Sequence, residues 1–328
     1  MSCSCFGTIK TMKLKYLSLM ILVALVFITS CTSNSPSSSS QGLSGFKALV
    51  MELRIPKSDF FVSDSSTDFE IPFNIIIKNE GTSTVSKNNA VLQISGFDPS
   101  LFSKAESKVV IPINQDIEGR STNRAFGDII VFSNPKDIDL KLTKEGIKNI
   151  KDRYEFDLFY NLCYKYKTSL SSSIKLNPLN TLNLVNDVSN QNSVSYSQGQ
   201  GAPLAVTRID VFSTNNKVLL TIYVEKKSGK LIYYSDSFST KDCGSVEFSS
   251  RNKFKVSKAS LSGKIAEDCV GKDKKGKEFY LDESGRGQIT CTFSLDDEIN
   301  SPITSILSLD LEYYVFDSIS QRFSVRKI

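Results

Sequence analysis

The chain of 328 residues contains no histidine and no tryptophan. Without imidazole it has no Ser-His-Asp or Cys-His catalysis, no His-ligated zinc, and no side chain that titrates near neutral pH unless its pKa is perturbed. The missing indole weakens the case for a carbohydrate site built on the largest aromatic platform. These absences exclude most hydrolases and metalloproteases. We identify no catalytic or cofactor-binding residue and expect a protein that is not an enzyme and needs no cofactor.

Long apolar runs are scarce, and the clearest one lies near the N-terminus. Lys13 and Lys15 precede an apolar stretch over residues 16–28. Because this stretch is shorter than the ~20 residues that a helix needs to cross a bilayer, the pattern predicts an export signal over residues 1–30. An uncleaved anchor helix over residues 14–31 is the alternative. Met1 and Met12 are both candidate initiators.

The stretch ends in residues 28–31, Ile-Thr-Ser-Cys, which resemble the lipobox of secreted lipoproteins. The resemblance implies that the leader is cut before Cys31 and that the Cys31 thiol carries a diacylglyceryl group. The acyl chains would then hold the protein on the membrane, facing the extracellular or periplasmic side. Residues 31–45 would form the lipidated cysteine and its tether, because this serine-rich tract has nothing to bury and is expected to remain flexible.

The charge balance argues against a nucleic-acid partner. The full chain has a net charge of +5. Removing the leader with its three lysines leaves 37 basic and 35 acidic residues, a mixed surface without the basic excess that nucleic-acid binding favours.

Four of the seven cysteines lie beyond the lipobox, in a compartment where disulfides persist. Four cysteines allow three connectivities, and the sequence does not decide among them. We favour Cys269 with Cys291, because they flank one strand-turn-strand unit. Cys163 with Cys243 would then tie the two halves of the chain together.

Alternation of apolar residues predicts β-strands through most of the chain. Residues 69–78 place Phe69, Phe73 and Ile77 on one face, and residues 217–224 alternate in the same way. A polar segment over residues 180–203 has the composition of an interdomain linker. We therefore expect an all-β protein with two β-sandwich domains in tandem, over residues 46–179 and 204–328. Residues 154–176 and 307–328 align loosely, each as a strand, a serine-containing turn and a second strand. A short helical turn is expected within residues 136–150.

The segment 69–97, with its turn Asn79-Glu80-Gly81, resembles the immunoglobulin-like modules of bacterial and archaeal surface lipoproteins, including the cell-adhesion-related bacterial domain. Their motif is an alternating strand, Asn-x-Gly and a second strand. The second half departs from it, because it offers Lys-Lys-Ser-Gly at the corresponding turn. The resemblance implies a sandwich and a surface role, and it carries over no catalytic residue.

Acidic loops are the remaining candidate sites. Asp296, Asp297 and Glu298 follow a predicted strand and supply the oxygen ligands that calcium prefers. The pairs Asp64 with Asp68 and Asp116 with Glu118 are similar. For each group we favour a hydrated loop whose carboxylates keep a strand edge from pairing with a neighbouring strand. Tyrosines are numerous in the predicted strands. We favour a role for them in the sandwich core and in cross-strand aromatic pairs over a role in an aromatic recognition surface.

These features predict a lipid-anchored, non-catalytic surface module that contacts a protein or an envelope glycan, or spaces other components. The alternative is a ligand-capturing lipoprotein subunit of a transporter or of a secreted enzyme complex. A defined concave pocket would favour the alternative, whereas open faces built from strands would favour the surface module.

Overall fold

The computed structural model describes residues 44–63, 65–177, 192–214, 216–236, 243, 248–271, 278–296 and 301–328. These residues are almost entirely in strands, so the predicted all-β class is confirmed. The expected helical turn is α2 (Lys144–Asn149), and Thr143 caps it by accepting a hydrogen bond from the Gly146 amide. Within the described ranges no helix is long and apolar enough to span a bilayer.

Strands cover most of the two predicted alternating segments, residues 69–78 and 217–224. In the N-terminal half they are β1 (Leu49–Arg54), β2 (Asp59–Val62), β3 (Phe69–Glu70), β4 (Phe73–Asn79), β5 (Ala90–Ser95), β6 (Lys108–Pro112), β7 (Ile129–Asn134), β8 (Lys141–Leu142) and β9 (Arg153–Leu176). In the C-terminal half they are β10 (Asn192–Ser195), β11 (Leu204–Ser213), β12 (Lys217–Lys226), β13 (Leu231–Tyr233), β14 (Lys253–Leu261), β15 (Lys264–Ile265), β16 (Asp268–Gly271), β17 (Glu278–Tyr280), β18 (Arg286–Ser294) and β19 (Ile303–Lys327). A short 3-10 helix, η1 (Phe248–Ser250), precedes β14.

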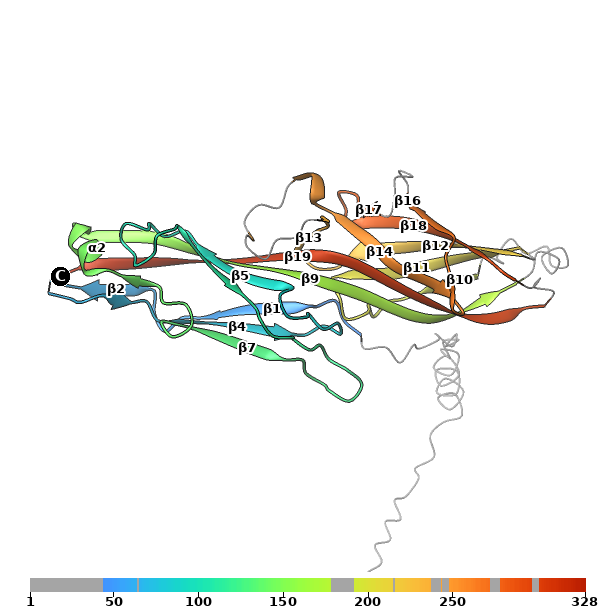
Figure 1. Cartoon of the computed structure of the whole chain (residues 1–328), viewed down its shortest axis with the longest axis horizontal. Helices are drawn as coiled ribbons and strands as arrows, with labels where there is room; N and C mark the ends of the chain where they lie inside the picture. The colour runs from blue at the N-terminus through green and yellow to red at the C-terminus, as the bar shows by residue number, and fades with distance from the viewer. Residues whose placement is uncertain are drawn as a thin grey trace, which may run out of the picture. The chain divides into compact units, whose positions relative to one another are not determined.

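Two very long strands, β9 and β19, run side by side through both halves (Figure 1). They pair antiparallel from Arg153 opposite Arg326 to Leu176 opposite Ile303, without a register shift. At 24 residues, β9 is about 80 Å long. The prediction of a serine-containing turn inside residues 154–176 and inside residues 307–328 is therefore wrong. Neither strand contains a glycine or proline that would break the alternation, so pairing continues through the serines.

The long ladder joins the two predicted domains. One nine-stranded sheet has the path β15-β14-β19-β9-β5-β6, with β13, β17 and β2 attached beside it, so strands from both halves share it. The described part of Ser40–Ile328 forms one compact unit. Residues 180–191 of the predicted linker lie outside the described residues, and residues 192–195 of it form β10, which pairs with β11. The count of two sandwiches that follow each other along the sequence is thus not confirmed, because β19 from the C-terminal half completes the sheet of the N-terminal half.

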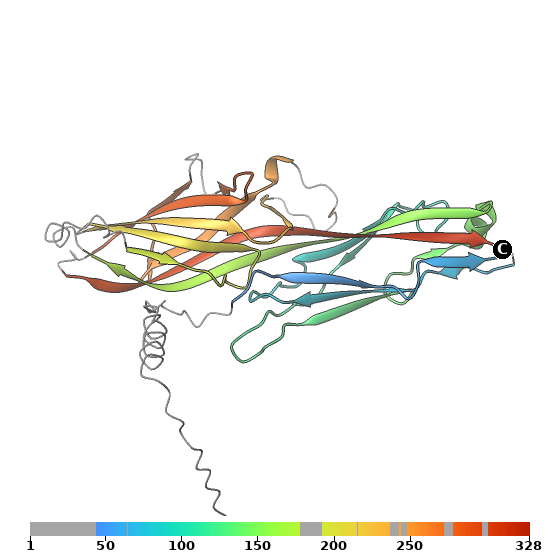
Figure 2. The same ribbon diagram turned by 180° about the vertical axis from the view of Figure 1, so that it is seen from behind.

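Two smaller sheets face the large sheet: β1-β4-β7 in the N-terminal half and β10-β11-β12-β18-β16 in the C-terminal half (Figures 1 and 2). The ring of Phe73 on β4 meets that of Tyr160 on β9 edge-on, with centroids 5.4 Å apart. In the other half, Thr168 Oγ1 on β9 donates to the carbonyl oxygen of Leu204 on β11 at 2.6 Å. Buried side chains from all three sheets form one continuous apolar core.

The Asn79-Glu80-Gly81 turn lies where the two halves meet. The buried Asn79 side chain donates to the carbonyls of Ser83 and Ile117, each at 2.9 Å, and accepts from the Gly81 amide at 3.1 Å. A Cβ on Gly81 would lie 1.9 Å from the Tyr166 hydroxyl oxygen and 2.6 Å from the carbonyl oxygen of Gly201. Only glycine fits this approach, so the asparagine and the glycine of the motif are both structural.

Candidate binding face on the five-stranded sheet

The predicted calcium ligands form no cluster in the described residues. Asp296 is 83% exposed and makes an ion pair with Lys264, while Asp297 and Glu298 lie outside the described residues. Asp116 accepts from the Lys87 amide at 2.7 Å, and Glu118 pairs with an arginine. The described part of the chain holds no group of three or more acidic or cysteine side chains that could bind a metal ion.

Of the remaining acidic candidates, Asp68 accepts from the Lys144 amide at 3.0 Å at the start of α2. Asp64 lies outside the described residues. Cys31, the predicted lipidation site, also lies outside them, so lipidation remains a prediction.

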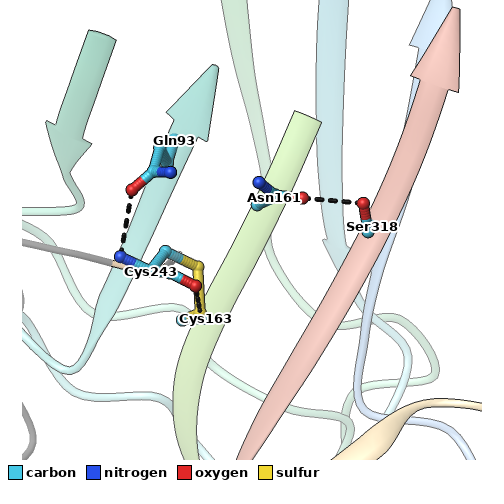
Figure 3. The surroundings of a disulfide bond; sticks show 5 residues. All are labelled: Gln93, Asn161, Cys163, Cys243 and Ser318. Atoms are coloured by element: carbon cyan, nitrogen blue, oxygen red, sulfur yellow. Dashed lines mark hydrogen bonds between the residues drawn. A yellow bond between two sulfur atoms is a disulfide. The ribbon is translucent and has the colours of Figure 1, made fainter. Parts of the chain in front are cut away.

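Two disulfides are formed, and they match the pairings that the sequence favoured. Cys269 on β16 joins Cys291 on β18, within the five-stranded sheet. Cys163 on β9 joins Cys243, on the face of the large sheet that points away from the core (Figure 3). There the Cys243 amide donates to Gln93 Oε1 on β5 at 3.1 Å. Cys243 is thereby fastened to two strands of the N-terminal half, β9 and β5.

The tyrosines are mainly structural, as favoured. Tyr160, Tyr164, Tyr166 and Tyr313 are fully or almost fully buried, and burial raises the pKa of each above its usual value. A second group, Tyr233, Tyr234 and Tyr314, packs together in a separate cluster. Tyr223 on β12 differs from these tyrosines, because it lies on the outer face of the five-stranded sheet.

Tyr223 belongs to a polar row that crosses four strands. Strand pairing places Ser195, Arg208, Tyr223 and Gln288 side by side on β10, β11, β12 and β18. Their outward direction follows from the alternation of the strands, since the next residue on β12, Ile222, is fully buried.

A bulge in β11 shapes the row. The register of β11 against β12 shifts between Val206 and Arg208, which inserts Thr207 as an extra residue. Bulges re-aim side chains and are frequent beside functional sites. Here the bulge is followed by Arg208, whose guanidinium lies over the Tyr223 ring at 4.2 Å from the centroid. The result is a stacked, planar pair on the sheet surface.

A shallow hollow of about 440 Å³ lies beside this pair. It is lined by Ser195, Thr207, Arg208, Tyr223, Val224, Glu225, Arg286 and Gly287. The turn before β18 fixes the backbone at its rim, because the Arg286 amide donates to Asp282 Oδ1 at 2.9 Å. A Cβ on Gly287 would lie 3.0 Å from the carbonyl oxygen of Tyr280, so glycine allows this close approach of the strand.

The charges around the hollow are unevenly paired. Arg208 Nη2 lies 3.0 Å from Asp210 Oδ2, and Lys227 Nζ lies 2.5 Å from Glu225 Oε2. Hydrogen bonding to Tyr223 and the nearby Asp210 charge raise the pKa of Arg208, which therefore stays cationic. Arg286 Nε is 4.0 Å from Glu225 Oε1, beyond hydrogen-bond distance, and its side chain is 70% exposed.

This arrangement offers groups that can hydrogen-bond a molecule lying on the sheet. It offers hydroxyls, guanidinium donors and an aromatic ring on the outer face of the sheet. Planar polar side chains next to an aromatic ring can hydrogen-bond hydroxyl groups and pack against the apolar face of a sugar.

Sequence reasoning did not single out Arg208, Tyr223 or Arg286 as a site. Alternation over residues 217–224 predicts this strand, but the core position that was favoured for the strand tyrosines is wrong for Tyr223, which lies on the outer face. Bringing Arg208 beside Tyr223 required the cross-strand register and the bulge, and neither is written in local sequence.

Comparisons with known proteins add little. No known family and no curated protein matches the chain. Two solved structures are similar at 9% identity each: "Biofilm associated protein - B domain", with a TM-score of 0.16, and "Enterococcal surface protein, partial N-terminal region", with a TM-score of 0.15. The matches cover 80% of this chain and 72% of the first structure, and 82% of this chain and 84% of the second. TM-scores this low do not establish a shared fold.

Proposed function

We propose that the protein is a lipid-anchored, non-catalytic module of the cell surface that binds an envelope glycan across the outer face of its five-stranded sheet. The row of Arg208, Tyr223 and Gln288 beside the shallow hollow carries the proposal. An extended, hydroxyl-rich chain can lie across such a row, whereas a small solute captured for transport needs a site that surrounds it. The lipobox resemblance at Cys31 supports the surface location.

Binding is tested with the full chain, purified in a neutral detergent, against a panel of soluble polysaccharides. A ligand of the folded state raises the unfolding midpoint by mass action, so thermal unfolding serves as the first readout and titration calorimetry as the second. Tyr223→Ala should weaken binding about tenfold or more, as expected when an aromatic contact is lost. Tyr280→Ala is the control, because Tyr280 is a strand tyrosine that is 44% exposed and does not line the hollow, whereas Tyr223 is half-buried and does line it.

Equal weakening by both substitutions, or binding that Tyr223→Ala leaves intact, would contradict a site on this face. No binding to any polysaccharide would overturn the glycan proposal and favour a protein partner. A midpoint raised only by small solutes would favour the ligand-capturing alternative.

The anchor is tested separately by Cys31→Ala. Loss of the thiol should remove the mass of the acyl chains from the protein. It should also either release the protein from the membrane fraction or leave it as a precursor that keeps its leader. A wild-type chain that carries no acyl mass and keeps residues 1–30 would favour the uncleaved anchor helix over residues 14–31.

A further inference from the structure

The hollow carries one cation in excess. Among the charged residues that line it, Arg208 and Arg286 contribute two positive charges and Glu225 contributes one negative charge. Arg208 pairs closely with Asp210 and Lys227 with Glu225, whereas the Arg286 guanidinium has a longer contact of 4.0 Å with Glu225 and lies near the Asp282 charge.

The Arg286 backbone is fixed while its side chain is exposed to solvent, so the guanidinium can contact a ligand. Its backbone is fixed by the Asp282 turn, while no side-chain hydrogen bond to a described residue fixes its guanidinium. A guanidinium offers a planar fork of N–H donors that matches a carboxylate or a sulfate. Arg286 lines the same hollow as the stacked pair of Arg208 and Tyr223.

We infer that the site recognises an acidic sugar unit, with its carboxylate or sulfate on Arg286 and its ring beside Tyr223. This inference rests on the proposed function and adds the chemical class of the ligand. The other groups of the hollow fit such a unit. Ser195 and Thr207 offer hydroxyls for sugar hydroxyls, and Glu225 can accept a hydrogen bond from a sugar hydroxyl while Lys227 balances its charge.

The test compares neutral and acidic probes on the full chain in neutral detergent. Dextran and laminarin are the neutral probes; carboxymethyl-dextran, dextran sulfate and alginate are the acidic ones; polyphosphate supplies the anion without a sugar. We expect at least one acidic polysaccharide to bind about tenfold or more tightly than the neutral ones, as a charge-assisted bidentate contact predicts.

Arg286→Gln should abolish the preference for acidic probes and leave any neutral binding in place. Arg286→Lys keeps the charge but loses the fork, so it should recover only part of the preference. Arg54→Gln is the matched control, since Arg54 is also an exposed arginine on an outer sheet face and pairs with Glu52 at 2.8 Å.

Each alternative outcome overturns the inference in a distinguishable way. Equal affinity for neutral and acidic probes would refute the acidic preference while the proposed function stands. Binding of no polysaccharide would remove the proposed function and the inference together. Polyphosphate bound as tightly as the acidic glycans would indicate an anion site without sugar recognition. An equal loss in Arg54→Gln would show that diffuse charge accounts for the preference.

Discussion

Two buried tyrosines that differ in their hydrogen bonding provide a direct test of the core. Tyr313 on β19 and Tyr160 on β9 are both fully buried. Since Thr168 Oγ1 donates to the Leu204 carbonyl, the Tyr313 hydroxyl donates to Thr168 Oγ1 at 2.9 Å and accepts from the Leu204 amide at 3.4 Å. The Tyr160 hydroxyl has no hydrogen-bond partner among the described residues.

Removing each hydroxyl should therefore have opposite consequences. Tyr313→Phe breaks two buried hydrogen bonds, which should lower the free energy of unfolding by about 1–2 kcal/mol. Tyr160→Phe removes a buried hydroxyl that makes no hydrogen bond to offset its loss of hydration, so it should leave the free energy of unfolding unchanged or raise it by about 1 kcal/mol. The two variants should thus differ by about 2 kcal/mol although the chemical change is the same.

The assay is urea unfolding of both variants with the disulfides intact, followed by circular dichroism. A change in midpoint at constant slope reports stability itself. Thermal midpoints give a second readout, with about 2–4 °C expected per kcal/mol for a large domain. A loss of more than about 1 kcal/mol in Tyr160→Phe, or no loss in Tyr313→Phe, would refute this account of the core.

Three further predictions concern crosslinks, pH and the central turn. Removing the Cys163–Cys243 disulfide, which closes a separation of 80 residues, should cost about 4.5 kcal/mol, and removing Cys269–Cys291, with a separation of 22, about 3.4 kcal/mol; denaturant unfolding of the two Cys→Ala pairs checks the order, and the reverse order would contradict it. Because burial raises the pKa of Tyr160, Tyr164, Tyr166 and Tyr313 above 10.0, their neutral forms stabilise the fold fully below pH 10.0, and this contribution is lost as pH rises further. Tyrosinate absorbance and circular dichroism should therefore change together in alkali, and core tyrosines that ionise while the fold persists would argue against this burial. Asn79→Ala loses three hydrogen bonds of a buried side chain and should cost about 2–3 kcal/mol in thermal or urea unfolding, whereas the exposed Asn74→Ala should be nearly neutral; equal effects of the two would count against the role of the turn.

The binding face shows why sequence reasoning reached only part of the site. Alternation over residues 217–224 predicts β12, but the expected core position of its tyrosine is wrong, because Tyr223 lies on the outer face. Its neighbours Arg208 and Gln288 lie 15 and 65 positions away in the chain, and only the register of β11 and β18 against β12 brings them into one row. A shift of one residue in either strand would send the partner side chain to the core face.

The sequence by itself determined the strands, because period-two alternation marks a half-buried strand wherever it falls. It also determined the absence of imidazole chemistry, and it favoured the two disulfides that form. The tertiary structure alone decided how the halves combine. The segments 154–176 and 307–328 are alike in pattern, and each could have completed a separate sandwich. They pair with each other instead, because two unbroken strands of matched length satisfy each other's backbone hydrogen bonds along their whole length, and such long-range pairing leaves no local signal in the chain.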